Sequence, residues 1–363
     1  MKRDIKVAMV TPWNRKGGIA NYSARLVEEL RANGTTVEPV PILNPETTNP
    51  FAFADIIERI PDDADVVHVQ FEAGLFGQLG MSGIGAPWFL CQLRSDPRQV
   101  VTTLHEVHAA HSHRGVVGDY LLRGRDTVIE SCALRASEEI VVHTRNAERI
   151  LRNRHGPEID VKRHLLPAER GKNPTPAEEA KERLGLSGPV LLTLGWIEPK
   201  KRFEDVIRAL PDIPDVTYFV VGDPHPGDED AFENALKLAE RLGVRDRVVR
   251  HEYVTDEDFD DVYGAANAVV LPYRRVSVSI AVNEALSYGV PIVTSSLPYF
   301  EELRDRYGCI LTYETQSELR SALEDSLFDA QRQSELHRRA DKYVREVNWN
   351  SFALWTQDLY LNV

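Results

Sequence analysis

Residues 264–296, GAANAVVLPYRRVSVSIAVNEALSYGVPIVTSS, decide the fold of this chain. The apolar runs 268–271 and 292–294 are typical of buried strands, and the segment between them, which carries Glu284, is predicted to form a short amphipathic helix. A strand, a loop, a helix and a second strand in this order indicate a parallel α/β sheet, in which anionic ligands bind where a strand ends and a helix begins. Ser279 is small enough to let backbone amides approach a phosphate there. The Glu284 carboxylate could accept hydrogen bonds from sugar hydroxyls.

The same stretch resembles the donor-binding segment of glycosyltransferase family 4, whose members are retaining enzymes of the GT-B fold. The family pattern is Glu-x-Phe-Gly-Leu-x-x-x-Glu-Ala followed by Gly-x-Pro-Val. Ser279 and Ile280 take the Gly-Leu place, Glu284 takes the place of the second Glu, and Val276 stands where the family has the first Glu. The resemblance implies that Ser279 and Ile280 donate backbone amides to the donor and that Glu284 holds its ribose. The first Glu of the family contacts the donor sugar.

Two other classes of function stay open, the first because of Val276 and the second because two doubly wound domains also suit it. A homologue without the first Glu could bind a nucleotide sugar, or act as a partner subunit, without transferring the sugar. A nucleotide-sugar epimerase of related fold would convert the donor without any acceptor. A nicotinamide enzyme is disfavoured because no strand is followed by a full Gly-x-Gly-x-x-Gly.

Composition indicates a large globular protein without a metal or disulfide framework. The 363 residues suggest about two domains, and 42% hydrophobic residues suffice for two buried cores. A net charge of −13 argues against nucleic acid as a partner. No apolar run approaches the ~18 residues of a membrane span, and the amino terminus runs directly into a strand-like pattern, so a cytoplasmic protein is expected. Three distant cysteines lie outside any Cys-x-x-Cys spacing: Cys91, Cys132 and Cys309.

A glycine-containing loop follows the first predicted strand. Residues 5–10 read as a buried strand, and Gly17 and Gly18 precede a helix predicted over 21–33. An anion pocket and a simple tight turn both fit this pattern. GGIANYSARLVEEL resembles the family's amino-terminal Gly-Gly loop, which implies that Gly17 and Gly18 lie beside the donor diphosphate and the acceptor.

A second candidate loop is residues 70–77, QFEAGLFG. It resembles a family subgroup with Gln-His-Glu-x-Gly-x-Phe-Gly, in which Phe71 replaces the His. The resemblance implies that Glu72 faces the acceptor. A glycine-rich surface loop without a ligand is the alternative.

Histidines cluster after the strand predicted over 99–105. TTLHEV resembles the family's Thr-x-His-Asp, which implies that His105 reaches the donor sugar; a hydrogen-bonded structural histidine is the alternative. The spacing lacks His-Glu-x-x-His, so no metal site is predicted. The other histidines of this loop are expected in an acceptor loop or on a solvated surface: His108, His111 and His113.

Residues 145–172 carry eight Lys or Arg against four acids. This local excess could meet an anionic acceptor or, peripherally, the inner membrane face. A solvated helix face with interspersed acids is the alternative.

A proline-rich passage over 167–176, after a strand predicted over 164–166, is the best domain boundary. Alternating strands and helices on both sides predict an α/β protein with two doubly wound Rossmann-like domains and a cleft between them, the GT-B fold. The first, acceptor-side domain is expected over 1–170, and the second, nucleotide-sugar-binding domain over 171–347. By the resemblance, a last helix at about 348–363 crosses back to the first.

Cations follow the first strand of the second half. GWIEPKKRF, 195–203, corresponds to the family's Gly-x-Ile-x-Pro-x-Lys-Gly, with Lys201 on its Lys and Arg202 replacing the Gly. Lys201 and Arg202 would neutralise a diphosphate leaving group, unless they are solvated surface cations. Val254 lies in a segment that resembles the loop whose backbone reads the base.

Together with these residues, the resemblance implies a retaining, mannosyltransferase-like enzyme of polysaccharide or glycoconjugate biosynthesis. It would move a hexose-type sugar from a GDP- or UDP-sugar to a hydroxyl of a saccharide, lipid-linked or small-molecule acceptor. The family chemistry passes the acceptor proton to a phosphate oxygen, so neither a protein nucleophile nor a cofactor or metal is expected.

Overall fold

The computed structural model describes residues 5–15, 17–110, 115–225, 227–255 and 258–362. The chain divides into two compact units. The first unit is Met1–Leu166 with Trp349–Val363, and the second unit is Pro167–Asn348. The division therefore falls at the start of the proline-rich passage, slightly before the expected boundary at 170. In both units strands alternate with helices along the chain, which confirms the predicted α/β class.

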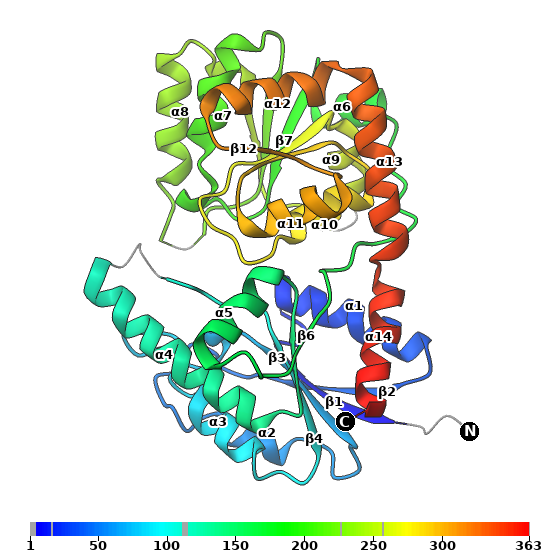
Figure 1. Cartoon of the computed structure of the whole chain (residues 1–363). Coiled ribbons are helices and arrows are strands. Elements are labelled where there is room, and N and C mark those ends of the chain that lie inside the picture. Colours follow the sequence, from blue (N-terminus) through cyan, green and yellow to red (C-terminus); the bar gives the residue numbers. More distant parts are fainter. Residues whose placement is uncertain (1–4, 16, 111–114, 226, 256–257, 363) are drawn as a thin grey trace. The chain divides into compact units, whose positions relative to one another are not determined.

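The first unit is built on a parallel sheet that has six strands over the described residues, in the order β2-β1-β3-β4-β5-β6 (Figure 1). Crossover helices are required because parallel neighbours cannot be joined by a tight turn. The strands are β1 (Lys6–Thr11), β2 (Thr36–Pro41), β3 (Val66–Phe71), β4 (Gln99–Leu104), β5 (Glu139–Val142) and β6 (Val161–Arg163). The helices are α1 (Gly18–Ala32), α2 (Asp55–Glu58), η1 (Ala73–Leu75), α3 (Ala86–Leu93), α4 (Gly115–Ala136), α5 (Arg145–His155) and α14 (Trp349–Asn362).

Side-chain alternation gives the two faces of this sheet different chemistry. Val67 and Val69 of β3 join the apolar core that contains residues of α2, α3, α4 and α5. Successive side chains of a strand point to opposite faces, so His68 and Gln70 lie on the other face. There the His68 ring contacts Tyr360 of α14, and α14 packs against α1. This second face is therefore buried and includes polar side chains.

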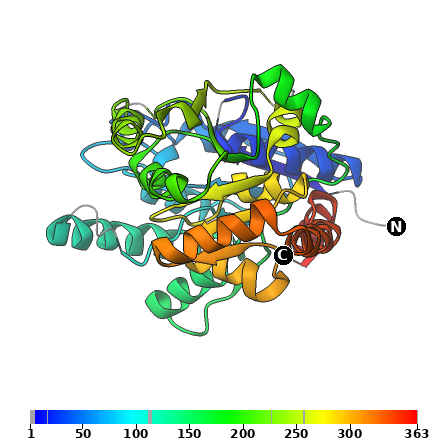
Figure 2. The same cartoon turned by 90° about the horizontal axis from the view of Figure 1, so that it is seen from above.

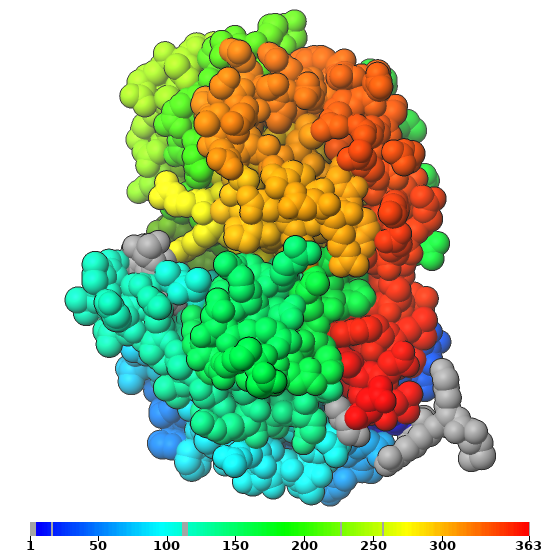
Figure 3. Space-filling view, in the orientation of Figure 1, coloured from blue at the N-terminus to red at the C-terminus, as the bar shows by residue number. Residues whose placement is uncertain are grey.

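Helix α4 differs from the other helices of its unit. In both cartoon views its amino-terminal half extends away from the sheet (Figures 1 and 2). Large apolar side chains are exposed there, including Val117 and Tyr120. Its remaining half packs against α5, and the two helices form a continuous surface in the space-filling view (Figure 3).

The second unit also has a parallel sheet with six strands over the described residues, in the order β12-β11-β10-β7-β8-β9. The strands are β7 (Val190–Leu194), β8 (Thr217–Val221), β9 (Val248–His251), β10 (Ala268–Leu271), β11 (Ile292–Ser295) and β12 (Leu311–Tyr313). The helices are α6 (Ala177–Leu184), η3 (Pro199–Lys201), α7 (Phe203–Ala209), η4 (Leu210–Asp212), α8 (Ala231–Arg241), η5 (Arg245–Arg247), α9 (Phe259–Ala265), α10 (Ile280–Ser287), α11 (Pro298–Tyr307), α12 (Gln316–Phe328) and α13 (Ala330–Glu346).

Local sequence signals set several of these helix ends. Thr315 and Glu318 form a capping box at the start of α12, in which each side chain bonds the other residue's backbone N–H. Gly185 and Gly308 end α6 and α11 in the left-handed conformation that glycine adopts without strain. The organising stretch 264–296 forms β10, α10 and β11 as predicted.

One predicted strand is wrong. The sequence placed it at 164–166, whereas β6 is Val161–Arg163 and pairs with β5. His164 N still bonds the Val142 carbonyl oxygen at 3.1 Å, but the chain then leaves the sheet. Leu165 and Leu166 are buried outside the sheet. Their apolar side chains resemble those of a buried strand, which explains the wrong prediction. No helix within the described ranges is long and apolar enough to cross a membrane.

Candidate functional site

The strand order of the second unit defines a switch point between β7 and β10. These two strands are neighbours, and the chain runs outward from β7 through β8 and β9 and, in the opposite direction, from β10 through β11 and β12. Ligands of open α/β sheets bind outside the carboxyl ends of the strands at such a point. The loops that leave β7 and β10 carry Lys201 and Ser279, respectively. Arg274 N bonds the Lys200 carbonyl oxygen at 2.7 Å, which joins the two loops.

Lys201 is a buried cation at this switch point. Its side chain folds back onto the end of β7, where Nζ donates to the Leu194 carbonyl oxygen at 2.7 Å and lies 5.7 Å from the centre of the Tyr273 ring. The residue is only 4% exposed. Burial lowers the pKa of Lys201 from 10.5 to about 7, against the opposing charge of Glu198. An amine that changes charge near neutral pH can respond to a nearby anion.

Arg202 has a different position from that of its neighbour. Its φ of 47° lies in the left-handed region, where it ends η3 and begins α7. Its guanidinium forms an ion pair with Asp205 on the first turn of α7. Arg202 is thus engaged on its own helix, and its role as a second cation for a diphosphate stays a prediction.

The amino terminus of α10 lies on the other side of the switch point. Ser279 Oγ accepts a hydrogen bond from Val282 N at 3.4 Å and caps the helix. The first N–H groups of any helix lack an intrahelical acceptor and can bind an anion, so the amides near Ile280 suit a phosphate. Glu284 lies one turn further on, and after burial its charge is the largest cause that raises the pKa of Tyr263. Secondary to burial, the same charge also raises the pKa of Tyr288, and Glu284 itself is partly exposed.

Two more residues of the second unit concern this helix and the neighbouring loop. Val254, predicted to be near the base, is buried just after β9. Asn283 was not predicted. Its Oδ1 accepts from the Tyr299 hydroxyl at 2.8 Å, and its Nδ2 donates to the Tyr343 hydroxyl at 3.2 Å, so it fixes α10 to α11 and α13. The sequence signal that could have identified Asn283 is a polar residue that follows an apolar run, directly before Glu284.

In the first unit the corresponding switch point lies between β1 and β3. The loop after β1 ends at Gly17, which has φ 145° and precedes α1, and Gly18 is the first residue of that helix. Both glycines are exposed. The loop after β3 begins with Glu72, which is half-buried and precedes η1. The structure thus brings the sequence-predicted Gly17, Gly18 and Glu72 to the carboxyl ends of neighbouring strands.

His105 directly follows β4, the next strand of the same sheet. Its ring is edge-on to Tyr22 with 4.7 Å between centroids, and its Nε2 lies 2.9 Å from Gln70 Oε1. Burial and, secondarily, the rings of His143 and His68 hold the pKa of His105 well below its usual value. A lowered pKa favours the neutral form of the His105 ring. Gln70, Tyr22 and His143 were not identified as site residues from the sequence.

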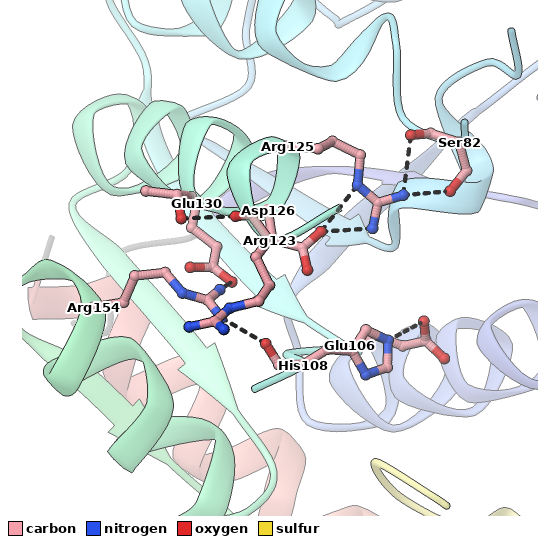
Figure 4. Close-up of polar contacts among 9 residues, drawn as sticks. Ser82, Glu106, His108, Arg123, Arg125, Asp126, Glu130 and Arg154 are labelled. Atoms are coloured by element: carbon pink, nitrogen blue, oxygen red, sulfur yellow. Dashed lines mark hydrogen bonds and ion pairs between the residues drawn. The ribbon is translucent and has the colours of Figure 1, made fainter. Parts of the chain in front are cut away.

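Figure 4 shows how the loop after His105 is attached to α4 and α5. Arg154 of α5 donates to the His108 carbonyl oxygen at 2.6 Å and to Glu130 of α4 at 2.5 Å. His108 in turn contacts Glu106 at 3.1 Å, while Arg125 binds Asp126 and Ser82. His111 and His113 lie outside the described residues. Across the described part of the chain, no group of three or more His, Cys, Asp or Glu side chains is placed to hold a metal ion.

The basic residues of 145–172 are mostly paired within the protein. Arg152 and Arg163 both contact Glu148, at 3.2 and 3.1 Å. Lys162 contacts Asp160 at 2.8 Å. These ion pairs favour a solvated helix face for this segment over a surface that binds an anionic acceptor or membrane.

Residues 175–347, almost the entire second unit, match the family model described as Glycosyl transferases group 1. The second unit therefore carries a domain of the group 1 glycosyltransferase family. D-inositol 3-phosphate glycosyltransferase of Xylanimonas cellulosilytica is 26% identical to this chain over 309 residues, which cover 82% of this chain and 71% of the relative. The protein of the same name from Mycobacterium sp. (strain JLS) is 30% identical over 204 residues, 53% of this chain and 46% of the relative. The match thus spans less than half of the mycobacterial protein.

A solved structure supports the fold of the whole chain. Anabaena Alr3699/HepE, determined in complex with UDP and glucose, superposes with a TM-score of 0.76 over 99% of this chain and 100% of that chain, at 15% identity. Together with the two doubly wound parallel sheets, this likeness confirms the GT-B fold that the sequence predicted.

Proposed function

We propose that this protein is a retaining group 1 glycosyltransferase that acts in the cytoplasm in glycan or glycoconjugate biosynthesis. It moves a hexose-type sugar from a GDP- or UDP-sugar to an acceptor hydroxyl. The observation that carries the proposal is the position of Lys201 and the capped amino terminus of α10 on the two loops that leave β7 and β10. A buried amine and free helical N–H groups suit the diphosphate of a nucleotide sugar.

In this proposal the second unit binds the donor. Lys201 faces the diphosphate and stabilises the negative charge that grows as the glycosidic bond breaks, with Arg202 as a second cation. Ser279 and Ile280 donate backbone amides, and Glu284 accepts from the ribose hydroxyls. The loop at Val254 contacts the base.

The first unit supplies the acceptor side. Neutral His105 can donate or accept a hydrogen bond without adding charge, so it orients the sugar. Gly17 and Gly18 leave room for the diphosphate and the acceptor, and Glu72 accepts from an acceptor hydroxyl. The names of the inositol phosphate relatives and the complex of the Anabaena protein with UDP and glucose support a nucleotide-sugar donor and a small hydroxylated acceptor. The proposed function does not depend on membrane contact by residues 145–172.

Calorimetric titration of the full chain without added metal tests the proposal. The panel is GDP, UDP and their hexose conjugates, with the Lys201→Met variant as a control for the site. We expect one nucleotide sugar to bind more tightly than its free diphosphate, and binding to be lost in the variant. The stereochemistry is then read by NMR from the anomeric configuration of the product. Absence of binding across the panel would contradict the proposal.

A further inference from the structure

A chain of buried polar side chains connects His105 to the carboxyl-terminal helix α14. Gln70 lies between two histidines: its Oε1 is 2.9 Å from His105 Nε2, and its Nε2 is 3.2 Å from His68 Nε2. The other ring nitrogen of His68, Nδ1, lies 2.6 Å from the Tyr360 hydroxyl. Gln70 is 0% exposed and His68 is 1% exposed, so these groups must satisfy one another.

The orientation of the Gln70 amide is fixed by a sulfur atom. Gln70 Nε2 lies 3.2 Å from Met9 Sδ. A thioether can only accept a hydrogen bond, so the amide NH₂ must face Met9. The carbonyl oxygen of the same amide then faces His105. A carbonyl can only accept, and His105 must therefore carry its proton on Nε2.

The same logic determines the state of His68. The Gln70 NH₂ group points at His68 Nε2, and the Thr103 hydroxyl lies 2.8 Å from the same atom. If His68 Nε2 carried a proton, it would face the amide protons of Gln70. Nε2 must therefore be the acceptor, and Nδ1–H donates to the Tyr360 hydroxyl oxygen. Each hydrogen bond in the chain between Tyr360 and His105 thus has one assigned donor and one assigned acceptor.

We propose that Gln70 is a positioning residue for His105: it locks the ring as the neutral Nε2–H tautomer, with Nδ1 left as its acceptor atom, and His68 and Tyr360 hold the Gln70 amide in place. The catalytic consequence rests on the proposed function, in which His105 orients the donor sugar. The tautomer itself does not depend on it.

The groups around His105 agree with a neutral ring. Tyr22 of α1 presents its ring edge-on, and His143, which follows β5, lies 5.9 Å away between ring centroids. His68 and Gln70 face His105 from β3. These neighbours are neutral or, if protonated, repel an imidazolium, whereas a carboxylate at the position of Gln70 would stabilise one.

The tautomer is measured directly by NMR on the full chain labelled with ¹⁵N-histidine. Long-range ¹H–¹⁵N correlations distinguish the two ring nitrogens, and the His105 signals are identified by their loss in His105→Gln. We expect wild-type His105 to be neutral and protonated on Nε2 at neutral pH. Gln70→Leu should release the ring into a mixture of tautomers. Gln99→Leu, a change at the exposed start of β4, should leave the His105 signals unchanged.

An Nδ1–H tautomer in the wild type, or an unchanged Nε2–H tautomer in Gln70→Leu, would overturn the proposal. If Gln70→Leu does not fold, Gln70→Glu replaces it, and there the proposal requires the His105 titration midpoint to move upward. Tyr360→Phe keeps the ring in α14 and should alter the His68 signals first. An unaltered His68 in that variant contradicts the assigned direction of the chain.

Activity gives a separate readout. With the donor identified, Gln70→Leu should lower kcat by about tenfold with little change in KM for the nucleotide sugar. The pH–rate profile of Gln70→Glu should shift, which loss of packing alone would not produce. If the tautomer is as expected but wild-type protein transfers no sugar, the proposed function fails while the positioning of His105 by Gln70 stands.

Discussion

Lys201 Nζ donates a hydrogen bond to the Leu194 carbonyl oxygen at 2.7 Å, so the loop after β7 closes onto the end of its own strand. The contact buries a basic group at the switch point of the sheet, and the pKa of Lys201 falls to about 7. A buried amine of this kind destabilises the empty protein and becomes favourable only when an anion arrives. Binding and stability should therefore respond in opposite directions when Lys201 is changed.

Lys201→Met should raise the stability of the ligand-free protein and abolish diphosphate binding. The folded pKa lies below that of the unfolded chain, so the penalty is fully present below about pH 7 and disappears as the pH rises toward the unfolded value of 10.5. Each pKa unit corresponds to ~1.4 kcal/mol. Allowing for the lost hydrogen bond to Leu194, we expect a gain of about 2–4 kcal/mol at neutral pH. Thermal and urea unfolding measure it, with Lys200→Met, a partly exposed neighbour, as the control; a lower midpoint than wild type would contradict this account.

Nucleoside diphosphate affinity should weaken as the pH rises above 7. A bound diphosphate raises the pKa of Lys201, so binding takes up a proton wherever the free amine is neutral, which is above about pH 7. The slope approaches tenfold in Kd per pH unit for one coupled proton. Titration calorimetry in buffers of different ionisation enthalpy counts the protons. Lys201→Arg, which stays charged, should flatten the dependence, and an equally steep dependence in that variant would assign it to another group.

Glu284→Ala should weaken donor binding with little effect on the fold. Glu284 is the fifth residue of α10 and is partly exposed. Removing its carboxylate should therefore leave the helix intact but take away an acceptor for the ribose hydroxyls. Loss of a hydrogen bond to a charged group is worth about 1.5–3 kcal/mol. Calorimetry with the donor and circular dichroism measure the two effects. Glu233→Ala on the exposed side of α8 is the matched control, and donor affinity equal to wild type in Glu284→Ala would count against the ribose contact.

The strands and helices were predictable because their apolar periodicity is strong, as in β7, β10 and α10. The sequence did not reveal the strand order, since the position of β7 beside β10 depends on crossover connections rather than on local pattern. The misplaced strand at 164–166 has the same origin, because Leu165 and Leu166 are buried outside the sheet.

Site residues could be predicted where a sequence motif contains them. They could not be predicted where the pairing register of two strands brings distant residues together. Gln70 and His105 are 35 residues apart, and they meet because Gln70 pairs with Thr103 in the β3–β4 register. Arg202 shows the reverse case. The sequence presents it as a free cation, but its left-handed backbone brings the guanidinium to Asp205, a local ion pair that the motif did not indicate.

Val276→Glu separates an active transferase from a non-catalytic binder. Val276 is half-buried on the loop before α10. If the chain is an active enzyme adapted to Val276, a new carboxylate close to a bound diphosphate adds repulsion, and we expect nucleotide-sugar affinity to stay equal or fall. The measurement is calorimetry with the nucleotide sugar and its free diphosphate in parallel, with Val276→Gln as the uncharged control. A clear gain in affinity for the sugar conjugate alone would support the non-catalytic alternative.

Asn283→Leu should destabilise the second unit. Its amide joins the Tyr299 and Tyr343 hydroxyls at 2.8 and 3.2 Å, and both tyrosines are almost fully buried. A leucine of similar size leaves two buried hydroxyls without this partner, at a cost of about 2–4 kcal/mol in the free energy of unfolding. Urea unfolding monitored by fluorescence measures the loss, with Asn234→Leu on the exposed face of α8 as the control. Adding Tyr299→Phe and Tyr343→Phe should recover part of the lost stability, because removing all partners of a hydrogen-bond network costs less than leaving polar groups unpaired. A triple variant less stable than Asn283→Leu would show that the tyrosines contribute through other contacts.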